Sequence, residues 1–236
     1  MSSIGEAAVA SRGICGELNE RMVGIEAEMH GSGATLDAAM TRSEAFLKIS
    51  EQLIETVSEC GVATSDTPYI EAAQRAAGEI AQRLEAALAQ GEATLVQLFD
   101  ESYQPMAGSN PPQHTTQFIA LADRLFPAVQ ERMLELSDKV VYCIAVDRNG
   151  YVAAHNRKYC QPQRAGDVVW NTANSRWRRI FNDRTGLASA RNQRPFLLQT
   201  YRRDMGGGKF VVMKEVAAPI VVRGRHWGGL RLAFRF

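Results

Sequence analysis

Cysteine is scarce in this 236-residue chain, and the cysteines that are present are widely separated. Cys15, Cys60, Cys143 and Cys160 form no C-x-x-C pair. Zinc sites are usually built from such close pairs, and disulfide scaffolds carry many cysteines in a short secreted chain. The sequence therefore predicts neither a zinc ribbon nor a disulfide framework.

Long apolar runs are absent as well. No stretch approaches the run of about 18 apolar residues that a membrane-spanning helix needs. Residues 1–10 contain Glu6, whereas a secretory signal peptide would have a basic start and an apolar segment there. Because 45% of the residues are hydrophobic, the chain can still form a core. We expect a cytoplasmic protein with no membrane partner.

Acidic residues are rare in the C-terminal part. Residues 141–236 contain five Asp and Glu against 18 Lys and Arg, whereas residues 1–140 contain 21 against nine. The net charge of +1 therefore combines about −12 and +13. Such a basic segment predicts either a binding site for an anion or a basic face that docks on an acidic one. The near-neutral total disfavours a nucleic-acid partner, although the basic half leaves that alternative open.

The basic half offers little for catalysis. Its five carboxylates give no evident pair for acid–base hydrolysis, and His155 has no nearby nucleophile with an acid partner. Residues 205–209, with three consecutive glycines, lack the strand and helix of a phosphate loop and predict a hairpin turn. We therefore expect no enzymatic activity.

Two histidines leave a metal alternative open. His155 with Tyr159 or Cys160, and His226 with Cys143, are residue types that ligate iron or haem. Their spacing specifies no such site, because single histidines more often make hydrogen bonds within a fold. We expect no cofactor and keep haem as the alternative.

The first 60 residues have helical periodicity. Apolar and small residues follow one another at alternating steps of four and three from Leu36 to Val57, which is the spacing of a coiled-coil seam. Gly31, Ser32 and Gly33 interrupt the pattern and predict a turn between two helices. We expect residues 1–62 to form a helical hairpin that dimerises with a second copy, with an intramolecular hairpin as the alternative.

The next segment, residues 63–138, predicts a helical lead-in. Helical periodicity covers residues 68–90, 94–99 and 115–137, with Pro68 at the first position of the first helix and Pro127 inside the last. From residue 139 the period changes to two. Strands are predicted at residues 140–146, 151–155, 196–202, 209–216, 219–222 and 230–234, and a short helix at residues 176–182. The expected fold is α+β, an antiparallel sheet over residues 139–236 with helices on one side.

Four stretches of this sheet region carry a family resemblance. They read DRNGYVAAHNRKYCQPQ (147–163), WNTANSRWRRIFNDRTGL (170–187), QTYRRDMGGGKF (199–210) and RGRHWGGLRLAF (223–234). Over residues 50–236 the chain resembles the C-terminal sensory region of soluble bacterial methyl-accepting chemotaxis proteins, in the Cache branch of PAS-like domains. Nothing in residues 1–60 resembles the kinase-contacting hairpin tip of those receptors.

The resemblance implies a cytoplasmic signal-transduction sensor that binds a small, anionic ligand in its C-terminal domain and relays binding through its N-terminal helices. The acidic helical half would contact a signalling protein. The alternatives are a protein-interaction adaptor that senses nothing and a haem-binding redox or gas sensor. Stacking surfaces, amides and positive charges between the sheet and its inserted segment are the expected ligand contacts. They are His155, Asn156, Tyr159, Trp170, Asn171, Asn174, Arg176, Arg191, Tyr201 and Lys214.

Overall fold

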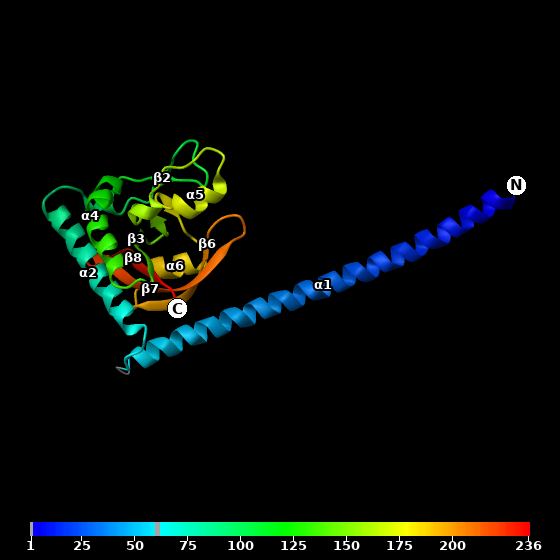
Figure 1. Ribbon diagram of the computed structural model, residues 1–236, viewed down its shortest axis with the longest axis horizontal. Coiled ribbons are helices and arrows are strands. Elements are labelled where there is room, and N and C mark those ends of the chain that lie inside the picture. Colours follow the sequence, from blue (N-terminus) through cyan, green and yellow to red (C-terminus); the bar gives the residue numbers. More distant parts are fainter. Residues whose placement is uncertain (1, 60–61) are drawn as a thin grey trace. The chain divides into compact units, whose positions relative to one another are not determined.

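The chain folds into an N-terminal helical region followed by an antiparallel sheet domain with helices, an α+β architecture (Figure 1). The computed structural model describes residues 2–59 and 62–236, so Cys60 lies outside the described residues. It divides into two compact units, Met1–Ser50 and Glu51–Phe236. The predicted α+β class is confirmed.

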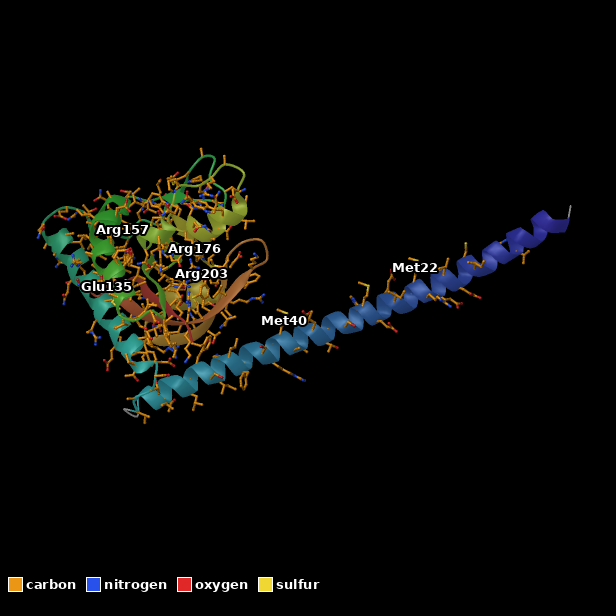
Figure 2. The ribbon with its side chains drawn as sticks, in the orientation of Figure 1. Met22, Met40, Glu135, Arg157, Arg176 and Arg203 are labelled. Carbon is orange, nitrogen blue, oxygen red and sulfur yellow. The ribbon has the colours of Figure 1, made fainter. Side chains whose placement is uncertain are left out.

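Helix α1 (Ser2–Glu59) is continuous, so the predicted turn at residues 31–33 is wrong. Glycine weakens a helix by about 1 kcal/mol relative to alanine but keeps its backbone N–H and C=O, so two glycines do not interrupt the hydrogen-bond ladder. Thr35 Oγ1 also donates to the Gly31 carbonyl at 2.9 Å. The apolar side chains of Met22 and Met40 are 60% and 57% exposed (Figure 2). Pairing of α1 with a second copy stays a prediction.

Three helices precede the sheet: α2 (Thr67–Ala89), α3 (Leu95–Leu98) and α4 (Ile119–Arg132), the last continued by a 3-10 turn, η1 (Met133–Glu135). The helices predicted at residues 68–90, 94–99 and 115–137 are thereby confirmed. The last begins four residues late because Thr115 belongs to a short strand, β2 (His114–Thr115), which pairs with β1 (Gln104–Pro105). The side chain of Thr94 accepts from the Gln97 N–H in a capping box at the start of α3.

The main sheet has four antiparallel strands in the order β3-β8-β7-β6. Its strands are β3 (Val140–Asp147), β6 (Leu197–Asp204), β7 (Phe210–Val222) and β8 (Arg225–Phe234). The predicted strands at 140–146 and 196–202 match β3 and β6. Those at 209–216 and 219–222 are parts of β7, and that at 230–234 is part of β8.

The predicted strand at residues 151–155 does not return beside β3. The turn forms as expected, because Asp147 Oδ1 accepts from the backbone N–H groups of Asn149 and Tyr151, both at 2.9 Å. After this turn only β4 (Tyr151–Val152) is extended, and it pairs with β5 (Arg179–Ile180). The place beside β3 is taken by β8, whose ten residues give a longer ladder.

The predicted helix at residues 176–182 is also wrong. Arg178 has φ 61°, a left-handed conformation that a helix does not accept. Its buried guanidinium pairs with Asp123 at 2.5 Å, which draws the segment into an extended path. Helices form on either side instead, as α5 (Val168–Asn174) and α6 (Arg184–Arg191), which are capped by the side chains of Asp167 and Asp183.

The two faces of the sheet are covered by different helices (Figure 1). Tyr69 of α2 stacks on Phe234 of β8 at 3.9 Å on the first face. On the opposite face Ser189 of α6 donates to Glu215 of β7 at 2.6 Å. The expectation that helices lie on one side of the sheet is therefore wrong. Because side chains alternate along a strand, β7 presents Val216, Ala218 and Ile220 to the apolar core under α2 and α4.

Two glycines should respond oppositely to alanine substitution. In β8, a Cβ on Gly228 would lie 2.0 Å from the Val146 carbonyl oxygen, so Gly228→Ala should destabilise the sheet domain by about 1–3 kcal/mol. In α2, a Cβ on Gly78 would meet no atom within 4 Å, so Gly78→Ala should stabilise by about 0.5–1 kcal/mol. Urea unfolding of both variants measures the difference. Equal effects would contradict the close approach of β3 and β8.

Candidate functional site

Polar side chains gather on the sheet face that α6 covers, where a second hydrophobic layer would be expected. Four strands contribute them at alternating positions, and all are less than 6% exposed. They are Tyr142 of β3, Gln199, Tyr201 and Arg203 of β6, Glu215 of β7 and Arg231 of β8. We use the name arginine–tyrosine cluster for Tyr142, His155, Tyr159, Arg176, Tyr201, Arg203, Glu215 and Arg231.

Glu215 is the hydrogen-bond acceptor at the centre of the cluster. Its Oε1 accepts from Arg231 Nε at 2.9 Å and from Ser189 Oγ at 2.6 Å, while Oε2 lies 2.8 Å from Arg231 Nη2. The hydroxyl of Tyr142 also donates to this carboxylate. Burial, reinforced by the Glu215 charge, raises the pKa of Tyr142 well above its usual value and keeps its proton in place. The charge of Arg231 is therefore neutralised inside the protein.

Arg203 is buried without such a partner. Its side chain is 1% exposed, and no described residue accepts a hydrogen bond from its Nε or Nη2. The guanidinium carbon lies 4.1 Å from the ring centroid of Tyr159 and 5.3 Å from that of Tyr142. Buried polar groups are almost always hydrogen-bonded, and buried charges are almost always paired. Arg203 departs from both rules.

Arg176 is the second buried cation with no carboxylate partner among the described residues. Its Nη1 donates to the backbone oxygens of Thr172 and Asp204, at 2.8 and 3.0 Å, which ties α5 to the end of β6. Burial and then the charge of Arg203 lower the pKa of Arg176 to about 10, so it is still charged at neutral pH. Figure 2 shows both arginines inside the sheet domain.

His155 adds no positive charge to the cluster. Its ring packs edge-to-face against Tyr142 and Tyr159, with centroid distances of 5.6 and 4.9 Å. Its Nδ1 accepts from the backbone N–H of Asn156 at 2.7 Å. Burial, and after it the charge of Arg203, lowers the pKa of His155 well below its usual value. With His155 neutral, three guanidinium groups face one carboxylate, which leaves two positive charges uncompensated.

The structure brings four of the ten predicted ligand contacts into this cluster: His155, Tyr159, Arg176 and Tyr201. Tyr201 lies edge-on to Tyr142 with a centroid distance of 6.4 Å, and the guanidinium carbon of Arg231 lies 5.3 Å from its ring centroid. Ligand contact by these residues stays a prediction.

Four other predicted contacts hold the surrounding backbone. Asn156 binds the backbone of Cys143 and Gln130, at 2.8 and 2.9 Å. The remaining three belong to α5. Asn171 binds the backbone of Arg164 and Asn110, Asn174 donates to the Trp170 carbonyl at 2.9 Å, and Trp170 lies under the guanidinium of Arg164 at 3.7 Å.

The last two predicted contacts lie elsewhere in the sheet domain. Lys214 projects from the opposite face of β7 and binds both carboxylate oxygens of Asp66, at 2.9 and 2.7 Å. Arg191 lines an open surface cavity of about 550 Å³, and its Nε donates to the Arg148 carbonyl at 3.3 Å. Asn149, Gln193, Arg225 and His226 complete that cavity.

Sequence reasoning missed Tyr142, Arg203, Glu215 and Arg231. A signal for two of them was present, because Arg203 follows Gln199 and Tyr201 at strand spacing and Arg231 stands between Leu230 and Leu232. A charged residue inside an apolar strand faces either solvent or a polar interior. The sequence does not say which, because that depends on whether a helix covers the second face.

Comparison with known proteins finds neither a matching family model nor a curated protein of significant similarity. Within residues 2–59 and 62–236, no helix combines the length and apolarity needed to cross a bilayer. The same part of the chain contains no group of three or more His, Cys, Asp or Glu side chains placed to hold a metal ion.

Removing the carboxylate of Glu215 should be costly. Glu215→Ala would leave Arg231 as another uncompensated buried charge, so we expect the free energy of unfolding to fall by about 3–5 kcal/mol. Glu71→Ala is a matched control, because the Glu71–Arg75 pair has side chains 58% and 68% exposed and should contribute less than about 1 kcal/mol. Urea unfolding provides both values. Similar losses in the two variants would refute the role of Glu215.

The buried His155 should make stability fall in acid. The pKa of His155 is depressed in the folded state, so below the unfolded-state pKa of about 6.5 the unfolded chain binds a proton that the folded chain does not. The free energy of unfolding is therefore unaffected above that pH and falls as the pH decreases below it. Between pH 6.5 and 5.5 the loss should be about 1 kcal/mol. His155→Gln, which cannot take up a proton, should lack this component in urea unfolding at each pH. Parallel pH profiles for the variant and the unchanged chain would show that His155 is not buried as a neutral ring.

Proposed function

We propose that the unit Glu51–Phe236 is a non-enzymatic sensory module that binds a small anion at the arginine–tyrosine cluster. The single observation that carries this proposal is Arg203, a fully buried guanidinium with two nitrogens that no described residue satisfies. An anionic ligand would supply the missing acceptor. The ligand's negative charge would lie near the positive charges of Arg203 and Arg176, neither of which Glu215 compensates.

A purely structural role fits these arginines poorly. Arg231 illustrates how this fold neutralises a buried guanidinium, with a carboxylate on the neighbouring strand at 2.8 Å. Leaving a buried charge unpaired costs several kcal/mol, so such a residue lowers stability unless binding uses it. Strain and unpaired groups of this kind concentrate at functional sites.

The cluster is also poorly equipped for catalysis. Its one carboxylate, Glu215, is saturated by Arg231, Ser189 and Tyr142. Burial keeps Tyr142 protonated and His155 neutral, and the backbone N–H of Asn156 occupies Nδ1 of His155. Acyl transfer usually requires a nucleophile within hydrogen-bond reach of a general base, and glycosyl transfer usually requires two carboxyl groups. The arrangement supports binding.

The resemblance to chemotaxis receptors implies a role for the binding site in signalling. The sheet domain would be a Cache-like member of the PAS-like domains in a cytoplasmic signalling protein. Strand β7 offers a route for the signal, because Glu215 faces the cluster while Lys214 binds Asp66 directly before α2. A ligand that shifts β7 would act on that ion pair and, through α2, on the N-terminal helix of a dimer.

An interaction adaptor is the second candidate. It is favoured by the apolar side chains that α1 exposes, among them Leu36, Phe46 and Ile49, which are 62%, 69% and 62% exposed. A surface of this kind usually marks contact with another protein. The two candidates differ in whether the sheet domain binds a small molecule.

Thermal unfolding of the full chain with panels of small anions, neutral compounds and cations tests the proposal. We expect at least one anion to stabilise the sheet domain, by about 2.7 kcal/mol at a concentration 100 times its Kd. Arg203→Met should abolish this stabilisation while raising the stability of the ligand-free domain, because it removes an unpaired buried charge. Arg191→Met, outside the cluster, should keep the response. Failure of every anion to stabilise the chain, with no small molecule seen in native mass spectrometry, would exclude the binding function.

A further inference from the structure

We infer that the ligand is a small organic acid whose carboxylate binds side-on to the Nε–Nη2 edge of Arg203. This inference rests on the proposed function and specifies its ligand class and the attachment point. The observations that carry it are the identity of the two unsatisfied nitrogens, the aromatic rings beside the guanidinium and the behaviour of its neighbour Arg231.

The two unsatisfied nitrogens of Arg203 lie on one edge of the guanidinium. The group is planar and rigid, and the N–H bonds of Nε and Nη2 on that edge point in the same direction. Their separation matches the two oxygens of a carboxylate, which can accept both hydrogen bonds at once. A single acceptor such as a hydroxyl or a ketone would satisfy only one of them.

Two aromatic rings lie close to this buried guanidinium. The ring of Tyr159 lies 4.1 Å from the guanidinium carbon and the ring of Tyr142 lies 5.3 Å from it, both within the range of cation–π contact. These contacts hold the plane of the group and cover its apolar surface. The rings accept no hydrogen bond from the guanidinium N–H groups, so Nε and Nη2 still lack an acceptor.

Arg231 shows the same chemistry completed within the chain. Its Nε donates to Glu215 Oε1 at 2.9 Å, and Nη2 forms an ion pair with Oε2 at 2.8 Å without the geometry of a hydrogen bond. Both arginines project from the same sheet face, and both guanidinium groups approach a tyrosine ring. Among the described residues Arg203 has no counterpart of Glu215, so an external carboxylate is the missing partner.

Arg176 is less suited to be the attachment point. Both of its described side-chain hydrogen bonds, at 2.8 and 3.0 Å, go from Nη1 to backbone oxygens, and they tie α5 to the end of β6. Its charge raises the electrostatic potential of the cluster and strengthens the binding of any acid there. Arg176 is thus a positioning residue that ties α5 to the end of β6, and the contact is assigned to Arg203.

Isothermal titration of the full chain with matched probes tests the inference. The probes are short aliphatic mono- and dicarboxylates, the carboxamides of the same carbon skeletons, and inorganic phosphate. We expect at least one acid to bind and its amide to bind roughly 10- to 100-fold more weakly, the usual difference between charged and neutral hydrogen-bond partners. Inorganic phosphate should bind more weakly than that acid.

Conservative variants distinguish the effect of the two hydrogen bonds from Arg203 from the effect of its positive charge. Arg203→Lys keeps the positive charge and loses the two-pronged edge, so acid binding should weaken at least about tenfold. Arg191→Met, at the surface cavity outside the cluster, should bind as the unchanged chain does. The unchanged chain gives a readout that does not depend on the folding of any variant, since the NMR signal of the Arg203 Nε–H should shift downfield when the acid is added.

The outcomes distinguish this inference from the function on which it rests. Equal binding of acid and amide, tighter binding of phosphate than of any acid, or an unmoved Arg203 Nε–H signal at saturation would overturn the carboxylate assignment while the sensory function stands. Undiminished acid binding by a folded Arg203→Lys variant would overturn it as well. If acids, amides and phosphate all fail to bind and no small molecule copurifies, both the carboxylate assignment and the proposed sensory function are wrong.

Discussion

The carboxylate of Glu215 is the interaction on which the sheet domain depends. From the middle of β7 it binds Arg231 of β8, Tyr142 of β3 and Ser189 of α6, and so joins three strands and a helix at one point. A buried carboxylate of this kind is stable only while all its donors are present. The polar network therefore fixes the position of α6 on the sheet. An apolar layer of similar volume would define that position less strictly.

Because side chains alternate along a strand, neighbouring residues of β7 lie in different environments on the two faces of the sheet. In β7, Val216 and Ala218 enter the apolar core beneath α2 and α4, whereas Glu215 enters the arginine–tyrosine cluster and Lys214 reaches Asp66 at the start of α2. Stability comes mainly from the first face, where burial of apolar surface is extensive. The second face can hold unsatisfied groups because the first compensates for them. Strand β7 thus contacts the cluster through Glu215 and the start of α2 through Lys214.

Two arginines of the cluster illustrate the difference between structure and function. Arg231 and Arg203 are both buried and both lie beside tyrosine rings, but only Arg231 meets an internal carboxylate. The first is a permanent part of the fold. The second is a buried group with two nitrogens that no described residue satisfies, and we propose that a ligand pairs with it. In the function that we propose, binding at Arg203 would be coupled to a small rearrangement of the sheet.

The sequence by itself determined most of the secondary structure and the excess of positive charge in the sheet domain. The apolar periodicity of residues 68–90 set α2, the period of two set the main strands, and the 18 basic residues after residue 140 pointed to an anion. Local patterns gave the wrong answer at residues 31–33, where glycines stay helical, and at residues 176–182, where the Arg178–Asp123 pair overrides helical propensity.

Only the tertiary structure decided which charges are compensated. Four of the ten predicted contacts meet in the cluster, while Lys214 and Arg191 point elsewhere. The partner of Tyr142 is 73 residues away, at Glu215, and the partner of Arg231 is on the strand before it. Composition counts arginines but cannot pair them, because pairing depends on strand order, on the face that each side chain takes and on the helix that covers it. Those three properties place a carboxylate beside Arg231 and leave Nε and Nη2 of the buried Arg203 without a described acceptor.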